Sequence, residues 1–76
     1  MKELRAFVKI FVDPSLIEDV IDSLFRIDAV EELYEITGEF DVVTLVSASD
    51  IEPFREVLKN KIMKINGVKS TVTLMF

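Results

Sequence analysis

The chain of 76 residues contains no cysteine, histidine or tryptophan. Without cysteine it forms neither a disulfide framework nor a cysteine-based zinc or redox site. Cysteine and histidine are also the side chains that most often serve as nucleophile and general base, and no serine here has a partner base that the sequence identifies. We therefore expect a protein that is not an enzyme and that uses no cofactor and no metal ion.

Long apolar runs are missing as well. The longest, such as residues 42–46, are far shorter than the roughly 20 residues that a membrane span needs. The first 12 residues do not have the pattern of a signal peptide. Glutamine is absent and asparagine occurs twice, which is compatible with a thermophilic source. We expect no membrane contact and a cytoplasmic location.

The composition is that of one folded domain covering residues 1–76. Half of the residues are apolar and 30% are charged, unlike the weakly hydrophobic composition of disordered chains. A domain of this size buries only about 60% of the surface that its unfolded chain exposes, so its core is thin. Because no disulfide can compensate, self-association is the natural source of added stability.

The net charge of −5 opposes a sequence-independent grip on nucleic acid phosphates. The basic residues are unevenly distributed, since Lys59, Lys61, Lys64 and Lys69 all follow the last acidic residue, Glu56. These lysines could contact phosphates, or they could complement the dipole at the end of a helix, which is the interpretation that we prefer. We expect no direct contact with nucleic acid.

The sequence predicts four strands and two helices. Strands are indicated by apolar runs or alternation, and helices by apolar residues at helical spacing behind a capping residue. The elements are a strand at 4–12, a helix from 13–14 to about 27, strands at 30–36 and 41–47, a helix from about 50 to 65, and a strand at 68–76. The apolar stripe of the first helix comprises Ile17, Val20, Ile21, Leu24 and Phe25.

This βαββαβ order predicts an α+β, ferredoxin-like sandwich. Right-handed crossovers place both helices on one face of a four-stranded antiparallel sheet. The glutamate-rich strand at 30–36 suits an edge, where charge discourages further pairing. The continuous apolar strand at 41–47 suits the centre of the sheet.

The face of the sheet without helices is the predicted surface for self-association. If the even-numbered residues of the first strand face the helices, Phe7 and Phe11 project from the open face. We expect Thr71, Thr73 and Met75 of the last strand beside them. Because a large apolar patch on a monomer usually marks an interaction surface, we predict a homo-oligomer built through Phe7, Phe11 and Met75.

The segment between the second and third strands is the most informative part of the chain. Gly38 supplies the permissive backbone of a hairpin turn, and Asp41 could cap that turn by bonding to nearby amides. The same arrangement could also bind a zwitterion, with the amides facing its carboxylate and Asp41 facing its ammonium. The sequence alone leaves both interpretations open.

Carboxylates near this segment offer a second interpretation, a site for a hard cation. The residues concerned are Glu31, Glu32, Glu35, Glu39 and Asp41. Their spacing matches no calcium loop, so a solvated edge strand is the preferred interpretation and no metal site is predicted.

Several short motifs, taken in order, resemble the effector domain of the Lrp/AsnC, or feast/famine, regulators. They are Thr37-Gly38-Glu39-Phe40-Asp41, Ser47-Ala48-Ser49-Asp50, Ile65-Asn66-Gly67-Val68 and Ser70-Thr71-Val72-Thr73. The resemblance implies an amino-acid effector bound near the glycine turn by Gly38, Glu39, Phe40 and Asp41, with Thr71 and Thr73 as further candidates. It also implies dimers that pack sheet against sheet and assemble into larger rings.

Two departures from the family pattern bear on function. Asn66 stands where the family often has proline, which changes the rigidity of that turn. Full-length members carry an N-terminal helix-turn-helix domain, whereas this chain starts three residues before its first strand, so we expect no recognition helix. The chain would then sense an amino acid, alone or with a full-length paralogue.

Two other classes of protein share features with this chain. A purely structural subunit that forms mixed oligomers with a DNA-binding paralogue is the main alternative. An amino-acid-binding ACT domain has the same element order, but it usually has glycine at the first strand-helix junction, where residues 13–16 read Asp-Pro-Ser-Leu.

Overall fold

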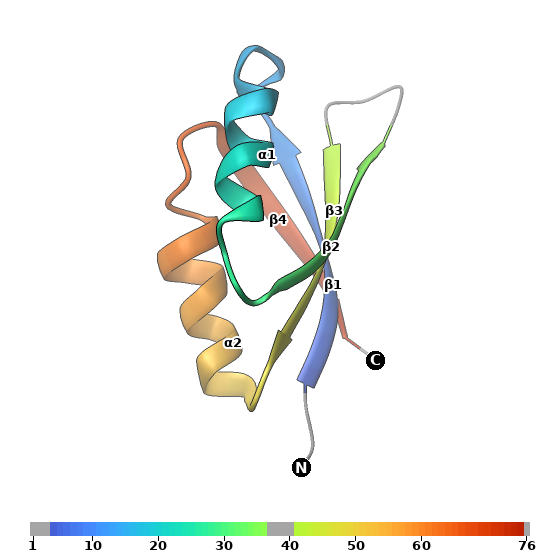
Figure 1. Cartoon of the computed structure of the whole chain (residues 1–76), viewed down its shortest axis with the longest axis vertical. Helices are drawn as coiled ribbons and strands as arrows, with labels where there is room; N and C mark the ends of the chain where they lie inside the picture. The colour runs from blue at the N-terminus through green and yellow to red at the C-terminus, as the bar shows by residue number, and fades with distance from the viewer. Residues whose placement is uncertain (1–3, 37–40, 76) are drawn as a thin grey trace.

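Two helices cover one face of a four-stranded antiparallel sheet in the computed structural model, which describes residues 4–36 and 41–75 (Figure 1). The strands are β1 (Leu4–Val12), β2 (Val30–Ile36), β3 (Asp41–Ala48) and β4 (Val68–Met75). The helices are α1 (Ile17–Phe25), preceded by the 3₁₀ turn η1 (Pro14–Leu16), and α2 (Ile51–Val57), continued by the π-helical turn η2 (Leu58–Ile62). The sheet order is β2-β3-β1-β4. The ferredoxin-like fold, the edge position of β2 and the central position of β3 are therefore confirmed.

Aspartates start both helical segments. The Asp13 carboxylate accepts hydrogen bonds from the backbone amide of Ser15 at 3.0 Å and from its hydroxyl at 2.9 Å. The Asp50 carboxylate accepts one from the amide of Ile51 at 2.8 Å. Each aspartate satisfies an amide that a helix end leaves without an intrahelical partner. This capping explains why the chain turns from strand to helix at these two points.

The core lies between the helices and the sheet. It is built from Ala6, Val8, Ile10 and Val12 of β1, Val42 and Val46 of β3, and Val20, Leu24, Ile27, Phe54 and Ile62 from the helical side. The only buried neutral polar side chain among the described residues, Thr44, donates to the carbonyl of Val8 at 3.3 Å. Burying these apolar groups is the main favourable contribution to folding.

Phe25 does not belong to the core stripe of α1, and its assignment to that stripe is wrong. Its side chain is 69% exposed, whereas its neighbour Leu24 is fully buried. Eight residues along an α-helix place Phe25 about 80° around the axis from Ile17. Val20 and Leu24 are the buried residues of α1, and Ile17 and Ile21 lie next to them on the same side of the helix. Phe25 lies at the margin of this apolar side and points toward solvent.

The register between β1 and β4 decides which side chains of β4 share a face with Phe7. In an antiparallel pair, residues directly opposite each other lie on the same face of the sheet. The pairs on the helix side are Ala6–Met75, Val8–Thr73 and Ile10–Thr71, and those on the open side are Phe7–Leu74, Lys9–Val72 and Phe11–Ser70. The expectation that Thr71, Thr73 and Met75 lie beside Phe7 and Phe11 is therefore wrong.

A β-bulge explains this difference. Phe11 pairs with Ser70, but the next residue, Val12, pairs with Val68, so Lys69 is the extra residue in β4. Val68 consequently turns toward the helices and packs against the core. Without the bulge, the even-numbered side chains of β4 would all lie on the same face as Val68. The extra residue moves the even-numbered side chains after it, including Val72, to the open face.

Candidate functional site

Asp41 is the only buried charged residue among those that the structure describes. It is the first residue of β3 and pairs with Ile36 of β2 and Phe11 of β1, so its side chain lies on the open face near one end of the sheet. The residue is 3% exposed. A carboxylate held out of water interacts strongly with any cationic group that reaches it.

Lys9 supplies a cationic partner to Asp41. Its Nζ lies 3.4 Å from Oδ2 of Asp41, and the exposed fractions of the two side chains are 43% and 5%. The same ammonium lies 5.1 Å from the centre of the Phe11 ring, within the range of a cation–π interaction. Lys9 was not among the predicted site residues, although its place between Phe7 and Phe11 in an alternating strand could have indicated it.

Two other carboxylates of the acidic group considered above, Glu31 and Glu32, also have partners. Glu31 accepts a hydrogen bond from Arg5 at 3.0 Å. Hydrogen bonds from the side chains of Ser47 and Arg5 hold the pKa of Glu31 below its ordinary value. Tyr34 donates to Glu32 at 2.6 Å, and this bond raises the pKa of the tyrosine hydroxyl.

These contacts leave the acidic residues dispersed. Within residues 4–36 and 41–75, no three histidine, cysteine, aspartate or glutamate side chains gather closely enough to hold a metal ion. No helix in that part of the chain is long and apolar enough to cross a membrane.

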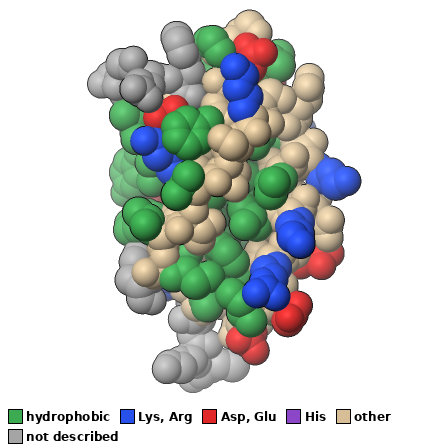
Figure 2. All heavy atoms as spheres, turned by 180° about the vertical axis from the view of Figure 1, so that it is seen from behind, with side chains coloured by type: hydrophobic (Ala, Val, Ile, Leu, Met, Phe, Trp, Pro, Cys, Tyr) green, Lys and Arg blue, Asp and Glu red, His purple; other side chains and the backbone are tan. Residues whose placement is uncertain are grey.

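The open face is largely apolar. By strand register it includes Phe7 and Phe11 of β1, Tyr34 and Ile36 of β2, Val43 and Leu45 of β3, and Val72 and Leu74 of β4. Val72 is 50% and Leu74 66% exposed. Hydrophobic side chains predominate along the sheet side of the molecule in Figure 2, whereas most charged side chains in that view lie along the opposite edge. The predicted place of Phe7 and Phe11 on this face is confirmed, and β4 contributes Val72 and Leu74 instead of Met75.

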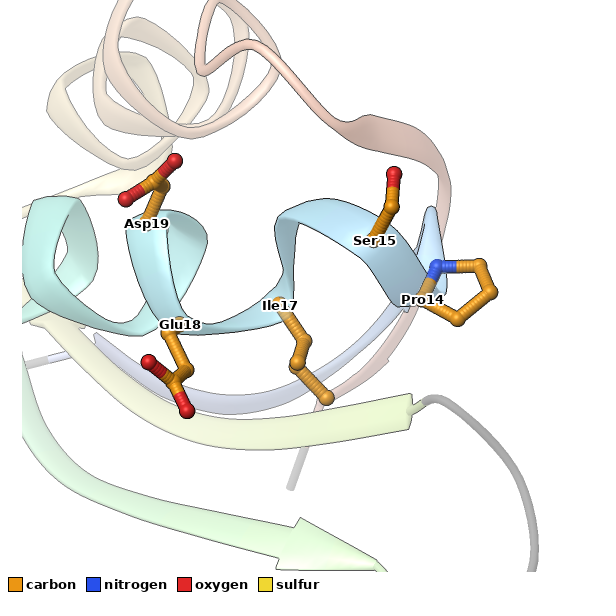
Figure 3. A pocket seen from close by; sticks show the side chains of 5 residues that line it. All are labelled: Pro14, Ser15, Ile17, Glu18 and Asp19. Carbon is orange, nitrogen blue, oxygen red and sulfur yellow. The ribbon is translucent and has the colours of Figure 1, made fainter.

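A pocket whose lining does not include Asp41 lies at the start of α1. It is lined by Pro14, Ser15, Ile17, Glu18 and Asp19. Figure 3 shows the carboxylates of Glu18 and Asp19 pointing in different directions, so they do not converge on one ligand. Acidic side chains in the first turn of a helix complement its dipole, which accounts for them without a ligand.

The predicted ligand-binding residues do not all lie together in the structure. Gly38, Glu39 and Phe40 lie outside the described residues. Thr71 and Thr73 face the helices, on the opposite side of the sheet from Asp41. Among the predicted ligand-binding residues that the structure describes, only Asp41 lies on the open face.

The sequence profile of the Lrp/AsnC ligand binding domain matches residues 5–76. The chain belongs to the Lrp/AsnC family. It is 35% identical over 75 residues to the transcriptional regulator Ptr1 of Methanocaldococcus jannaschii, covering 95% of this chain and 51% of that regulator. The chain thus spans about half the length of the curated relatives that it matches.

Solved structures of Lrp/AsnC proteins have the same fold. AsnC from E. coli superposes with a TM-score of 0.89 at 28% identity, over 96% of this chain and 50% of AsnC. The feast or famine regulatory protein of M. tuberculosis, complexed with L-methionine, superposes with a TM-score of 0.79 at 31% identity, over 96% of this chain and 49% of that one. The ferredoxin-like sandwich described above is therefore the Lrp/AsnC ligand-binding fold.

Proposed function

We propose that this chain is an oligomeric sensing module that binds an amino acid beside Asp41. The observation that carries the proposal is the buried carboxylate of Asp41, directly after the connection between β2 and β3. An amino acid presents an ammonium that such a carboxylate attracts. The M. tuberculosis relative, 31% identical to this chain, was solved with L-methionine, which has this head group.

The proposed site also includes Gly38, Glu39 and Phe40, whose part in it rests on the sequence. Backbone amides of a glycine turn suit the carboxylate of the same zwitterion. Thr71 and Thr73 could reach a ligand at Asp41 only from another subunit, because their own side chains lie across the sheet. Their role in binding stays a prediction.

The second part of the proposal is self-association through the open face, first as a dimer and then as a ring. The apolar side chains of this face are what supports it, since apolar area removed from water is the usual driving force of association. A ligand seated near such an interface shifts assembly when its affinity differs between the assembled and free forms.

We further propose that the chain takes part in the control of transcription without binding DNA itself. Its relatives are transcriptional regulators. In the part of the chain that the structure describes, α1 and α2 each connect two strands, and the net charge of the chain is −5. Both features favour a role in sensing, alone or with a full-length paralogue, and no catalytic step is proposed.

Calorimetric titration with each standard amino acid, including L-methionine, tests the binding site. We expect heat from at least one amino acid with the wild type and a loss of affinity of about tenfold or more in Asp41→Asn, because a charge-assisted contact is removed. Asp22→Asn makes the same change on the exposed surface of α1 and serves as the control. Absence of binding to every amino acid at millimolar concentration would remove the sensing function.

The alternative is a purely structural subunit. The observation that favours it is the set of exposed apolar residues on the open face. It predicts mixed oligomers with a DNA-binding paralogue that tolerate Asp41→Ala and are abolished by Phe7→Glu. Retained assembly together with silent titrations would select this alternative.

A further inference from the structure

The ion pair between Lys9 and Asp41 lies where the proposed ligand site meets the proposed interface. We propose that Lys9 is a built-in competitor of the effector, whose ammonium occupies Asp41 until the ammonium of an amino acid replaces it. The displaced lysine then opposes the packing of a second copy on the open face. This inference rests on the proposed function, namely an amino acid bound through Asp41.

The competition follows from the chemistry and burial of the pair. Lys9 presents to Asp41 the same group, a primary ammonium, that an amino acid would present. Because only 5% of the Asp41 side chain is exposed, a second ammonium reaches the carboxylate only if Nζ moves aside. Lys9 is 43% exposed, so its long side chain can swing into water, where an ammonium is well solvated.

The exchange is feasible because one ammonium replaces another. Asp41 is buried, so leaving its carboxylate without a partner would be costly, and an amino acid that displaces Lys9 keeps it paired. The distance of 3.4 Å from Nζ to Oδ2 is also longer than that of a short charge-assisted hydrogen bond. Lys9 therefore neutralises Asp41 in the free protein without holding it irreversibly.

The position of Lys9 on the sheet connects this exchange to assembly. Its neighbours on the open face are Phe7 and Phe11 along β1, and Val43 and Val72 directly across from it. A second copy that packs on these apolar neighbours would also remove water from the ammonium of Lys9. A paired ammonium tolerates that loss far better than an unpaired one.

Ligand binding and covering of the open face therefore compete through one side chain. With Lys9 on Asp41, the face presents a neutral pair and can be covered. With an amino acid on Asp41, covering the face would desolvate an unpaired Lys9. By reciprocity, a second copy on the open face lowers the affinity for the amino acid by the same factor that the amino acid lowers the affinity for the second copy.

Lys9→Met tests the competition, because methionine keeps the length of the side chain and removes the ammonium. At equal protein concentration, we expect Lys9→Met to bind its best amino acid about three- to tenfold more tightly than the wild type, because the amino acid no longer has to displace a competing ammonium. Lys9→Arg retains a cation and should stay near the wild-type affinity. Lys61→Met, an identical substitution on the exposed surface of η2, is the matched control and should leave the affinity unchanged.

Sedimentation velocity with and without saturating amino acid provides a second measurement. The wild type should shift toward smaller species when the amino acid is added, whereas Lys9→Met should lose most of this shift. An amino acid that strengthens self-association of the wild type would overturn the inference.

The titrations separate the failure of the inference from the failure of the proposed function. Equal or weaker binding by Lys9→Met, with clear binding by the wild type, overturns the role of Lys9 and leaves the amino-acid site standing. Binding by Lys9→Met alone supports both. Silence of both proteins with L-methionine and every other standard amino acid overturns both.

Discussion

Gly67 shows how one residue closes the last turn before β4. Its φ is +107°, a conformation that side chains disfavour, and its carbonyl accepts a hydrogen bond from the amide of Asp13 at 2.8 Å. A Cβ atom here would lie 2.9 Å from Cβ of Leu16 and 2.9 Å from Cγ2 of Val20. The turn thus ties the end of β1, the start of α1 and the start of β4 together.

Gly67→Ala should accordingly lower the free energy of unfolding. The backbone conformation alone costs about 1–3 kcal/mol for a residue with a side chain, and the two close approaches add to it. Urea unfolding at fixed protein concentration measures the effect. Asn66→Ala, at the exposed neighbouring position, should change stability by less than about 0.5 kcal/mol, and equal effects of the two changes would contradict this account.

Asp13 connects the same turn to pH. Hydrogen bonds from the backbone amide and then the hydroxyl of Ser15 hold the pKa of its carboxyl below the ordinary value. Because the pKa is lower in the folded state, the stabilisation is complete above the pKa of the unfolded chain, about 4. It is lost as the pH falls below that value through the folded-state pKa.

We expect Asp13→Asn to weaken the acid dependence of stability below about pH 4 relative to the wild type, since asparagine still caps the turn but does not titrate. Glu31, whose pKa is also lowered, keeps part of the dependence in both proteins. Unfolding curves recorded at intervals from pH 6 to about pH 2 are the measurement. Parallel pH profiles for the two proteins would show that the cap contributes nothing.

At the scale of elements, the order and approximate bounds of the strands and helices could be predicted from the sequence. Apolar periodicity and capping residues act locally, and the crossover rules then leave few arrangements. The side-chain directions in β4 could not be predicted in this way. They depend on the bulge at Lys69, which forms only when β4 pairs with β1, a contact distant in sequence.

The candidate site shows the same division. The position of Asp41 at the start of a strand was visible in the sequence, because an apolar strand that follows turn-forming residues has local signals. Its pairing with Lys9 was not, because that contact depends on the register between β1 and β3. Register is set by the whole sheet, and a shift by one residue would move every side chain to the other face.

The flank position of Phe25 in α1 gives a test at this scale. Leu24→Ala should cost about 2–5 kcal/mol of stability, because it leaves a cavity in the core. Phe25→Ala, one residue further along the same helix, should cost less than about 0.5 kcal/mol because its side chain is exposed. Thermal or urea unfolding compares the two, and a large loss in Phe25→Ala would place that side chain in an interface or in the core.

At the scale of the whole molecule, the proposed self-association would make part of each subunit's stability depend on the contact with a second copy. A chain of 76 residues has a thin core, so covering the open face would add to the stability of each subunit. The apparent stability should then rise with protein concentration.

Leu74→Glu places a charge on the open face and should convert the oligomer to a monomer of 8.7 kDa at micromolar concentration in sedimentation velocity. Phe25→Glu is a control of similar exposure, 69% against 66%, on the helical side of the molecule, and it should retain the dimer. A wild type that sediments only as the monomer would exclude the proposed interface altogether.

The pairing of β1 with β4 has a practical consequence for attaching labels or tags to the chain. Ala6 pairs with Met75, so both described ends of the chain leave the sheet at the same end, whereas Asp41 pairs with Phe11 at the opposite end of β1. Ala6 and Phe11 are five residues apart along β1, a distance of roughly 17 Å. A fluorophore, affinity tag or fused reporter at either terminus would therefore stand off from the candidate ligand site, and two reporters, one at each terminus, would start out as near neighbours.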